Sequence, residues 1–143
     1  MTSTMMEEND TLKFHHLGLV VPTIISGRTH LESLLGSMVW GASIVDPLQN
    51  VSICFGHQPN SDLVYELIEP SIEGSPIDRA LKENKNILNH IAYKSTDFKA
   101  SCQSLRSKGC APLSRPQPAV AFNGSKIMFF LTPLKFIIEV IES

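Results

Sequence analysis

The 143-residue chain contains little cysteine and no long hydrophobic run. Its three cysteines form no C-x-x-C pair, so we expect no disulfide framework and interpret Cys54, Cys102 and Cys110 as small buried residues. No apolar stretch approaches the length of a membrane-spanning helix, and the polar start MTSTMMEEND lacks the basic and apolar parts of a signal peptide. We therefore expect a cytoplasmic protein that has no membrane partner.

An excess of charge of one sign is also missing. Twelve Lys and Arg stand against fourteen Asp and Glu, and no run of basic residues supplies the stripe that a phosphate backbone requires. Nucleic acid is therefore not a predicted partner. The hydrophobic content of 43% and the charged content of 18% are those of a globular chain, and the length suits one domain with a real core.

Hydrophobic periodicity and turn residues predict an α+β chain in which the order β-α-β-β-β occurs twice. In the first half we expect a strand, a helix and three strands at 14–21, 28–35, 39–45, 51–55 and 63–68. In the second half we expect a strand, a helix and four short strands at 88–94, 98–107, 111–113, 119–122, 126–131 and 136–141. A helix at 77–85, capped near Ser75, links the halves.

This pattern predicts a flexible N-terminus at 1–12 and one domain at 13–143. Within the domain we expect a first module at about 13–70, a linker with a helix at about 71–87, and a second module at about 88–143. The two modules are predicted to form one curved mixed sheet around a cleft.

Two histidines and two glutamates recur at matching places in the two halves. His16 and His90 lie in the first strand of each half, 74 positions apart, and each is followed two residues later by a small residue. Glu66 and Glu139 lie in the last strands, 73 positions apart, within the shared order apolar-apolar-Glu-apolar-apolar-Glu. The repeat therefore predicts that each module presents one histidine and one glutamate.

Side-chain alternation along the first strand places His16, Gly18 and Val20 on one face, and His15, Leu17, Leu19 and Val21 on the other. We expect the apolar face to pack on the helices, and His16 and His90 to point to the concave side. Glu66 and Glu139 would be costly to bury alone, and two imidazoles with two carboxylates suit a divalent ion such as Zn, Ni, Co, Fe or Mn. A cleft that keeps these residues without binding metal remains an alternative. Three histidines without repeat partners are interpreted as surface or supporting residues, namely His15, His30 and His57.

The chain resembles the vicinal oxygen chelate superfamily, the paired β-α-β-β-β fold of glyoxalase I, extradiol dioxygenases, fosfomycin-resistance proteins and methylmalonyl-CoA epimerase. The resemblance covers about residues 13–142 and is most similar to the epimerase branch. It is carried by HHLGLVV, YELIEP followed by GSPIDRALKENK, NHIAYKS and the last strand. The resemblance implies that the metal ligands are His16, Glu66, His90 and Glu139, and that the protein is a homodimer.

The strand at 126–131 is apolar on both faces, with Ile127, Phe129 and Leu131 alternating with Met128 and Phe130. We expect one face to pack on the helices and the other to meet the cleft or a partner chain. This pattern agrees with the homodimer that the resemblance implies.

One position departs from the epimerase pattern. Epimerases typically carry a catalytic Glu in a V-P-E-Q-G stretch, and the matching stretch here reads D-P-L-Q-N, with Leu48 in place of the base. A leucine cannot abstract a proton. The expected reaction, metal-assisted proton abstraction next to a carbonyl or thioester by an isomerase or lyase, would then use Glu139 or Glu66 as the base. A small molecule, in particular an acyl thioester, is the expected substrate.

Two other functions remain open. One is a glyoxalase I-like lactoylglutathione lyase, and the other is a non-catalytic protein that binds a small molecule in the same cleft. The leucine at position 48 favours the binding protein, whereas retention of all four ligand-type residues favours the enzyme. Dioxygenase chemistry is less favoured, because Fe(II) oxygenases typically use two histidines and one carboxylate.

Overall fold

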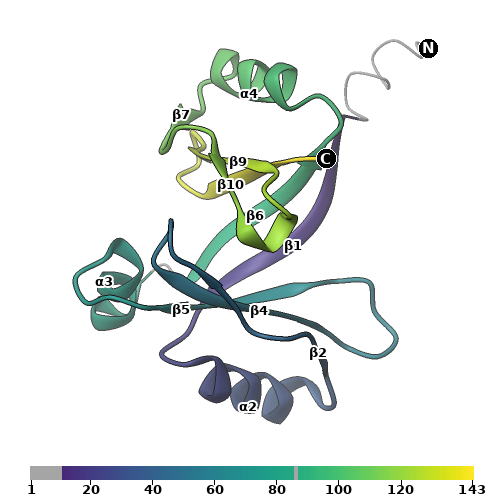
Figure 1. Ribbon diagram of the computed structural model, residues 1–143, viewed down its shortest axis with the longest axis vertical. Coiled ribbons are helices and arrows are strands. Elements are labelled where there is room, and N and C mark those ends of the chain that lie inside the picture. Colours follow the sequence, from purple (N-terminus) through teal and green to yellow (C-terminus); the bar gives the residue numbers. More distant parts are fainter. Residues whose placement is uncertain (1–10, 86) are drawn as a thin grey trace. The chain divides into compact units, whose positions relative to one another are not determined.

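A computed structural model describes residues 11–85 and 87–143 of the chain (Figure 1). Most of the segment predicted to be a flexible N-terminus therefore lies outside the described residues. The described residues form ten strands, three α-helices and one 3-10 helix. They divide into two compact units: the first unit is residues 16–89, and the second unit combines residues 11–15 with residues 90–143.

The first unit contains a mixed set of strands and two helices. Its strands and first helix are β1 (Leu12–Val20), of which residues 12–15 belong to the second unit, α2 (Ile24–Leu35), β2 (Val39–Trp40), β3 (Ile44–Asp46), β4 (Val51–His57) and β5 (Tyr65–Pro70). The strand order is β2-β4-β5-β1, and β3 also pairs with β4. The pair β1–β5 is parallel and the others are antiparallel. Helix α3 (Pro76–Glu83) follows β5.

The second unit repeats this arrangement. Its elements are β6 (Leu88–Ser95), α4 (Phe98–Ser107), β7 (Ala111–Pro112), β8 (Gln117–Pro118), the 3-10 helix η1 (Val120–Phe122), β9 (Lys126–Leu131) and β10 (Ile137–Glu142). The strand order is β6-β10-β9-β7, with β8 on β9. The pair β6–β10 is parallel, and β9 is antiparallel to its neighbours. The predicted α+β class with two β-α-β-β-β modules is confirmed.

Side-chain caps explain where the helices begin. Helix α2 starts at Ile24, earlier than predicted, because Thr23 and Ser26 form a capping box that satisfies the first free backbone N–H groups. Helix α3 starts at Pro76, one residue before the predicted start, and its predicted cap is confirmed: the hydroxyl of Ser75 accepts a hydrogen bond from the backbone N–H of Asp78 at 3.0 Å. The carboxylate of Asp97 caps α4 in the same way.

The strand predicted at 39–45 is split in two. Trp40 pairs with Gly56 and Ile44 pairs with Ile53, so three residues of one strand face two of β4. The extra residue is a β-bulge, which interrupts the ladder between β2 and β3. Hydrophobic alternation does not reveal such an insertion, because both flanking pieces keep strand-like residues.

The strand predicted at 119–122 is wrong. Residues 120–122 form η1, and its C-cap residue Asn123 lies in the left-handed region, with φ of 55°. Backbone N–H groups of Ser125 and Gly124 donate to the carbonyls of Phe122 and Ala119, at 3.0 Å each. The segment is therefore the closed turn between β8 and β9, and its apolar side chains serve packing without strand pairing.

In the first unit the helix covers the predicted face. Leu19 and Leu67 are register partners and share one face of the parallel pair. A Cβ built at Gly27 of α2 would lie 3.1 Å from Leu67 Cδ1, so the absence of a side chain lets the helix approach this face closely. The apolar face of β1 therefore packs on the helix, as predicted, and His16 belongs to the other face.

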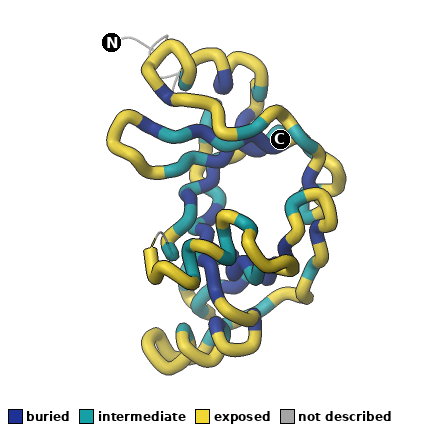
Figure 2. The backbone as a smooth tube through the Cα atoms, turned by 90° about the vertical axis from the view of Figure 1, so that its left-hand side faces the viewer, coloured by how far each residue is buried: buried dark blue, intermediate teal, exposed yellow. Residues whose placement is uncertain are grey.

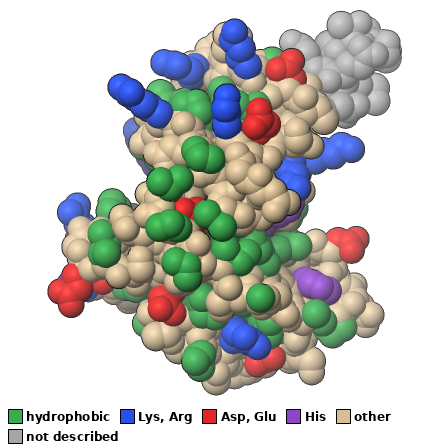
Figure 3. Space-filling view, in the orientation of Figure 1, with side chains coloured by type: hydrophobic (Ala, Val, Ile, Leu, Met, Phe, Trp, Pro, Cys, Tyr) green, Lys and Arg blue, Asp and Glu red, His purple; other side chains and the backbone are tan. Residues whose placement is uncertain are grey.

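Helix α2 is lightly packed within its unit. It buries only Ile24 and Gly27, and most of its length is exposed in Figure 2. Ile25 is 79% exposed and Leu34 is 65% exposed. Figure 3 shows hydrophobic side chains at the molecular surface on the face in view.

The second unit has a core on each face of its strands. Five buried residues pack together on the face of α4, with four partly buried neighbours: Cys102, Cys110, Met128, Phe130 and Val140, with Leu12, Phe98, Leu105 and Ile138. On the opposite face lie Ala92, Ala119, Ile127 and Ile141, with Phe122 and Phe129 packed against them. Both faces of β9 thus contribute to the packing of this unit. All three cysteines are free and buried, as predicted.

Candidate functional site

The first unit holds one buried histidine and one buried glutamate in contact. Residue Glu66 of β5 pairs with Gly18 of β1, two residues after His16, so Glu66 and His16 share one face of the parallel pair. His16 Nε2 lies 3.3 Å from Glu66 Oε1. His16 is fully buried and Glu66 is 6% exposed. Strand register alone therefore brings this pair together, on the face opposite the helix.

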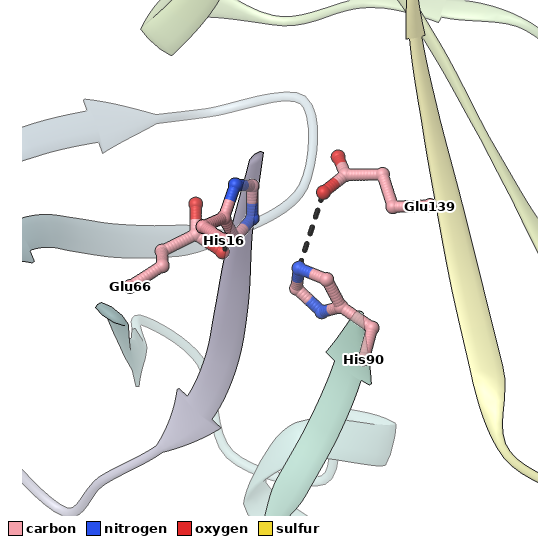
Figure 4. A group of neighbouring side chains, drawn as sticks. All are labelled: His16, Glu66, His90 and Glu139. Atoms are coloured by element: carbon pink, nitrogen blue, oxygen red, sulfur yellow. Dashed lines mark ion pairs between the residues drawn. The ribbon is translucent and has the colours of Figure 1, made fainter. Parts of the chain in front are cut away.

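The second unit contains the same pair in the same register. Glu139 of β10 pairs with Ala92 of β6, two residues after His90. His90 Nε2 lies 3.1 Å from Glu139 Oε1, and both residues are 3% exposed. Figure 4 shows both pairs, with a dashed line between His90 and Glu139. The predicted repeat of one histidine and one glutamate per module is thus a repeat of geometry within each unit.

Two phenylalanines that were not among the predicted site residues complete this pattern. Phe55 of β4 pairs with Glu66, and Phe129 of β9 pairs with Glu139. The Phe55 ring meets the His16 ring edge-on, with centroids 5.4 Å apart and planes at 72°. The Phe129 and His90 rings do the same at 5.5 Å and 77°. Phe55 and Phe129 lie 74 positions apart, the same spacing as the histidines, so the repeat contained this signal.

The side chains of each pair suit a divalent metal ion. Each pair offers imidazole nitrogen and carboxylate oxygen, the donors that Zn, Fe, Co, Ni and Mn accept in proteins. All four residues are buried, and a carboxylate held away from water needs a compensating positive charge. The donor chemistry of His16, Glu66, His90 and Glu139 therefore fits the predicted cofactor.

The second glutamate of each repeated strand motif has a different task. Glu69 points to the helix side, where its Oε1 accepts a hydrogen bond from the backbone N–H of Ile24 at 2.7 Å. Glu142 Oε1 accepts from the backbone N–H of Lys126 at 3.1 Å. These carboxylates satisfy backbone donors at the start of α2 and of β9.

Leu48 lies in the turn between β3 and β4. The buried carboxylate of Asp46 accepts hydrogen bonds from the backbone N–H groups of Leu48 and Gln49, at 3.1 and 3.3 Å, and from the Gln49 side chain at 2.9 Å. The Leu48 side chain itself is 59% exposed. The hydrogen bonds to Asp46 therefore stabilise the turn without the Leu48 side chain, and nothing in the described residues requires leucine at this position.

The three remaining histidines have other neighbours within their own units. His30 is exposed on α2. His57 is half-buried, with Nδ1 2.8 Å from the carbonyl oxygen of Gln58. The His15 ring lies edge-on to Phe122, with centroids 5.5 Å apart. Their roles stay predictions.

Comparison with known proteins identifies the family. The sequence model of the Glyoxalase/Bleomycin resistance protein/Dioxygenase superfamily matches residues 15–129. The chain belongs to this superfamily. The match includes His16, Glu66 and His90, and ends within β9, ahead of Glu139. The resemblance predicted from the motifs is confirmed.

Similar proteins include named epimerases. An ethylmalonyl-CoA/methylmalonyl-CoA epimerase of Cereibacter sphaeroides is 29% identical over 118 residues, which are 82% of this chain and 86% of the relative. A methylmalonyl-CoA epimerase structure from Mycobacterium tuberculosis matches with a TM-score of 0.74 at 23% identity, covering 90% of this chain and 86% of the other. A Streptomyces coelicolor methylmalonyl-CoA epimerase variant in complex with 2-nitronate-propionyl-CoA matches at 0.73 and 22% identity, covering 92% and 96%. These structures share the fold.

The helices of the described residues are all too short or too polar to cross a bilayer.

Proposed function

We propose that this protein is a metal-dependent, methylmalonyl-CoA-epimerase-like enzyme that abstracts a proton next to the carbonyl of an acyl thioester. One observation carries the proposal: two repeated units each bury a histidine and a glutamate in contact, at the same strand register. A single buried His–Glu pair is an ordinary feature of a core. Two pairs with the same register, partners and burial indicate a shared chemical task.

The proposed metal site uses both pairs together. One pair alone supplies two ligands, whereas catalytic zinc sites typically use three protein ligands. We therefore propose that His16, Glu66, His90 and Glu139 bind one ion, so that the modules at 13–70 and 88–143 act as a single domain. Zn, Ni, Co, Fe and Mn all accept this ligand set.

When bound, such an ion stabilises the negative charge that develops on a carbonyl oxygen as the neighbouring carbon loses its proton. The proton acceptor in our proposal is Glu139 or Glu66, because Leu48 has no basic atom. Each of these carboxylates already lies within 3.3 Å of an imidazole Nε2, which holds it in place. Their burial keeps bulk water from competing for the proton.

The proposed substrate class is an acyl thioester. Support comes from the relatives, one named an ethylmalonyl-CoA/methylmalonyl-CoA epimerase and another solved with a propionyl-CoA analogue. A second candidate function is non-catalytic binding of a small molecule, which the leucine at position 48 favours. The two functions make different predictions for proton exchange.

The decisive experiment measures metal content and proton exchange on the same preparation. The purified protein is analysed for bound metals and then incubated with methylmalonyl-CoA in D₂O, with the α-proton followed by NMR. We expect about one divalent ion per chain and enzyme-dependent exchange that Glu139→Gln or Glu66→Gln lowers at least about 100-fold. Metal binding without exchange of this or other acyl-CoA thioesters would contradict catalysis and favour the binding protein.

We also propose that the protein forms a homodimer. The predicted source of the interface, the apolar strand at 126–131, contributes to the packing of its own unit on both faces. Ile25 and Leu34 of α2 support the homodimer better than this strand does, because large apolar side chains exposed at a surface favour association.

A further inference from the structure

The aromatic rings beside the two histidines are arranged alike in the two units. In the first unit, strand β5 lies between β4 and β1, so Phe55 and His16 approach each other from either side of Glu66. In the second unit, β10 lies between β9 and β6, and Phe129 and His90 flank Glu139 in the same way. In each unit the phenyl ring contacts the imidazole edge-on, although the strands that carry the two rings are separated by the strand that carries the glutamate.

We infer that Phe55 and Phe129 are positioning residues that hold the rings of His16 and His90 in the orientation needed to bind metal. The inference rests on the proposed function, because it concerns the same four ligands. It goes beyond that function by assigning a role to two residues that can neither ligate a metal nor transfer a proton.

A histidine ring rotates about a broad, nearly two-fold torsion, and a half turn places a ring carbon where each nitrogen was. In both units Nε2 faces the glutamate. An edge-on phenyl ring at 5.4 or 5.5 Å is a preferred aromatic geometry and opposes rotation of the imidazole away from it. Because the phenyl ring carries no donor or acceptor, it restrains the imidazole without competing for its nitrogens.

The same rings also exclude water from the carboxylates of Glu66 and Glu139. Phe55 and Phe129 are the register partners of Glu66 and Glu139, so each phenyl lies beside one carboxylate on the same face. Attraction between a carboxylate and a cation is stronger where water is excluded. Loss of the ring should therefore weaken metal binding through both orientation and hydration.

The test replaces each ring by an aliphatic side chain of similar hydrophobicity. Zn²⁺ affinity is measured by competition with a chromophoric chelator for the parent protein, Phe55→Leu, Phe129→Leu and the double variant. Groups that orient a metal-binding histidine typically change metal affinity 10- to 100-fold, and we expect about a 10-fold loss for each single variant. The double variant should lose about 100-fold, if the two substitutions act independently.

Two controls separate positioning from core packing. Phe98→Leu removes a ring of the α4 core, on the other face of the strands, and should lower thermal stability without changing Zn²⁺ affinity. Phe55→Tyr and Phe129→Tyr keep the ring and should retain parent affinity. The absorption spectrum of bound Co²⁺ should change in the Leu variants and stay the same in the Tyr variants and in Phe98→Leu. If a Leu variant does not fold, Phe→Met at the same position replaces it.

The outcomes distinguish this inference from the proposed function. If the parent binds Zn²⁺ and the Phe55 and Phe129 variants bind it equally well, the inference is wrong and the metal site stands. If the parent binds no Zn²⁺, Co²⁺ or other divalent ion, the proposed function is wrong and the inference fails with it. A 10-fold loss of Zn²⁺ affinity in the Leu variants, together with parent affinity in the Tyr variants, would establish the positioning role.

Discussion

Gly18 of β1 lies opposite Glu66 of β5 in a parallel pair, and Ala92 of β6 lies opposite Glu139 of β10 in the equivalent place. The residue opposite each glutamate shares its face, so its side chain competes with the carboxylate for space. A residue no larger than alanine leaves room for the glutamate to turn toward the histidine. The small residue two positions after each histidine is therefore part of the geometry of the His–Glu pair.

Enlarging this position should separate the pair. We expect Ala92→Leu to lower the free energy of unfolding by about 1–3 kcal/mol, because Ala92 is fully buried and the added atoms overpack the site. The same variant should bind Zn²⁺ more weakly, since Glu139 is displaced from His90. Urea unfolding and a Zn²⁺ titration measure both effects, with Ala92→Gly as the control that removes volume. Parent values in both measurements would contradict this account.

Removing one proposed ligand should release the metal. In His90→Ala one of four ligands is lost, and we expect Zn²⁺ affinity to fall at least about 100-fold, the upper end of what loss of a supporting group alone causes. Metal analysis after gel filtration checks this. His30→Ala, in the exposed part of α2, is the matched control and should keep the parent metal content. Equal metal in His90→Ala and the parent would exclude His90 as a ligand.

Restoring a carboxylate at the expected base position should create or raise epimerase activity. General bases contribute about 10²- to 10⁴-fold, so Leu48→Glu should exceed the parent by a measurable factor in a methylmalonyl-CoA epimerase assay. Since Leu48 is 59% exposed, the change should alter stability by less than about 0.5 kcal/mol. Leu48→Gln is the matched control without a basic oxygen. No gain in a folded, metal-loaded Leu48→Glu protein would show that the pocket serves another substrate.

The buried thiol of Cys102 should make stability fall in alkaline solution. Burial raises the pKa of Cys102 from 9.0 to about 11, against a smaller opposite effect of Arg106. The folded state thus favours the neutral thiol, and this contribution is fully present below pH 9 and is lost as the pH rises toward 11. Urea unfolding at pH 8 and pH 10.5 should show a smaller decline for Cys102→Ala than for the parent. An equal decline would contradict the assignment to Cys102.

The proposed homodimer predicts a particle of twice the 15.8 kDa chain mass in sedimentation at micromolar concentration. If the exposed part of α2 contributes to the interface, Leu34→Glu should shift the equilibrium toward the monomer, because a charge buried against a partner is unfavourable. Lys99→Glu, a charge reversal on α4, is the control that should leave the mass unchanged. A parent protein that sediments at 15.8 kDa would contradict the proposal.

Some of this structure was accessible from the sequence and some was not. One histidine and one glutamate per module could be predicted, because side-chain alternation along a strand and the internal repeat can both be read from the sequence. Phe55 and Phe129 were missed because a phenylalanine in a strand normally signals core packing, and only the register shows which residue it faces. The bulge between Trp40 and Ile44 was missed for a different reason. Its extra residue is defined by the partner strand β4 and by nothing within its own segment.

Strand β5 makes two separate interactions, one on each of its faces. Glu66 points to the histidine face, while Glu69, three residues later, points to the helix face and receives the first N–H of α2. Insertion or deletion of a single residue between Glu66 and Glu69 would place both side chains on the same face, so that one of the two interactions would be lost. We therefore expect this protein to tolerate insertions and deletions in the turn at 58–64. The same changes within Tyr65–Pro70 should prevent folding and metal binding.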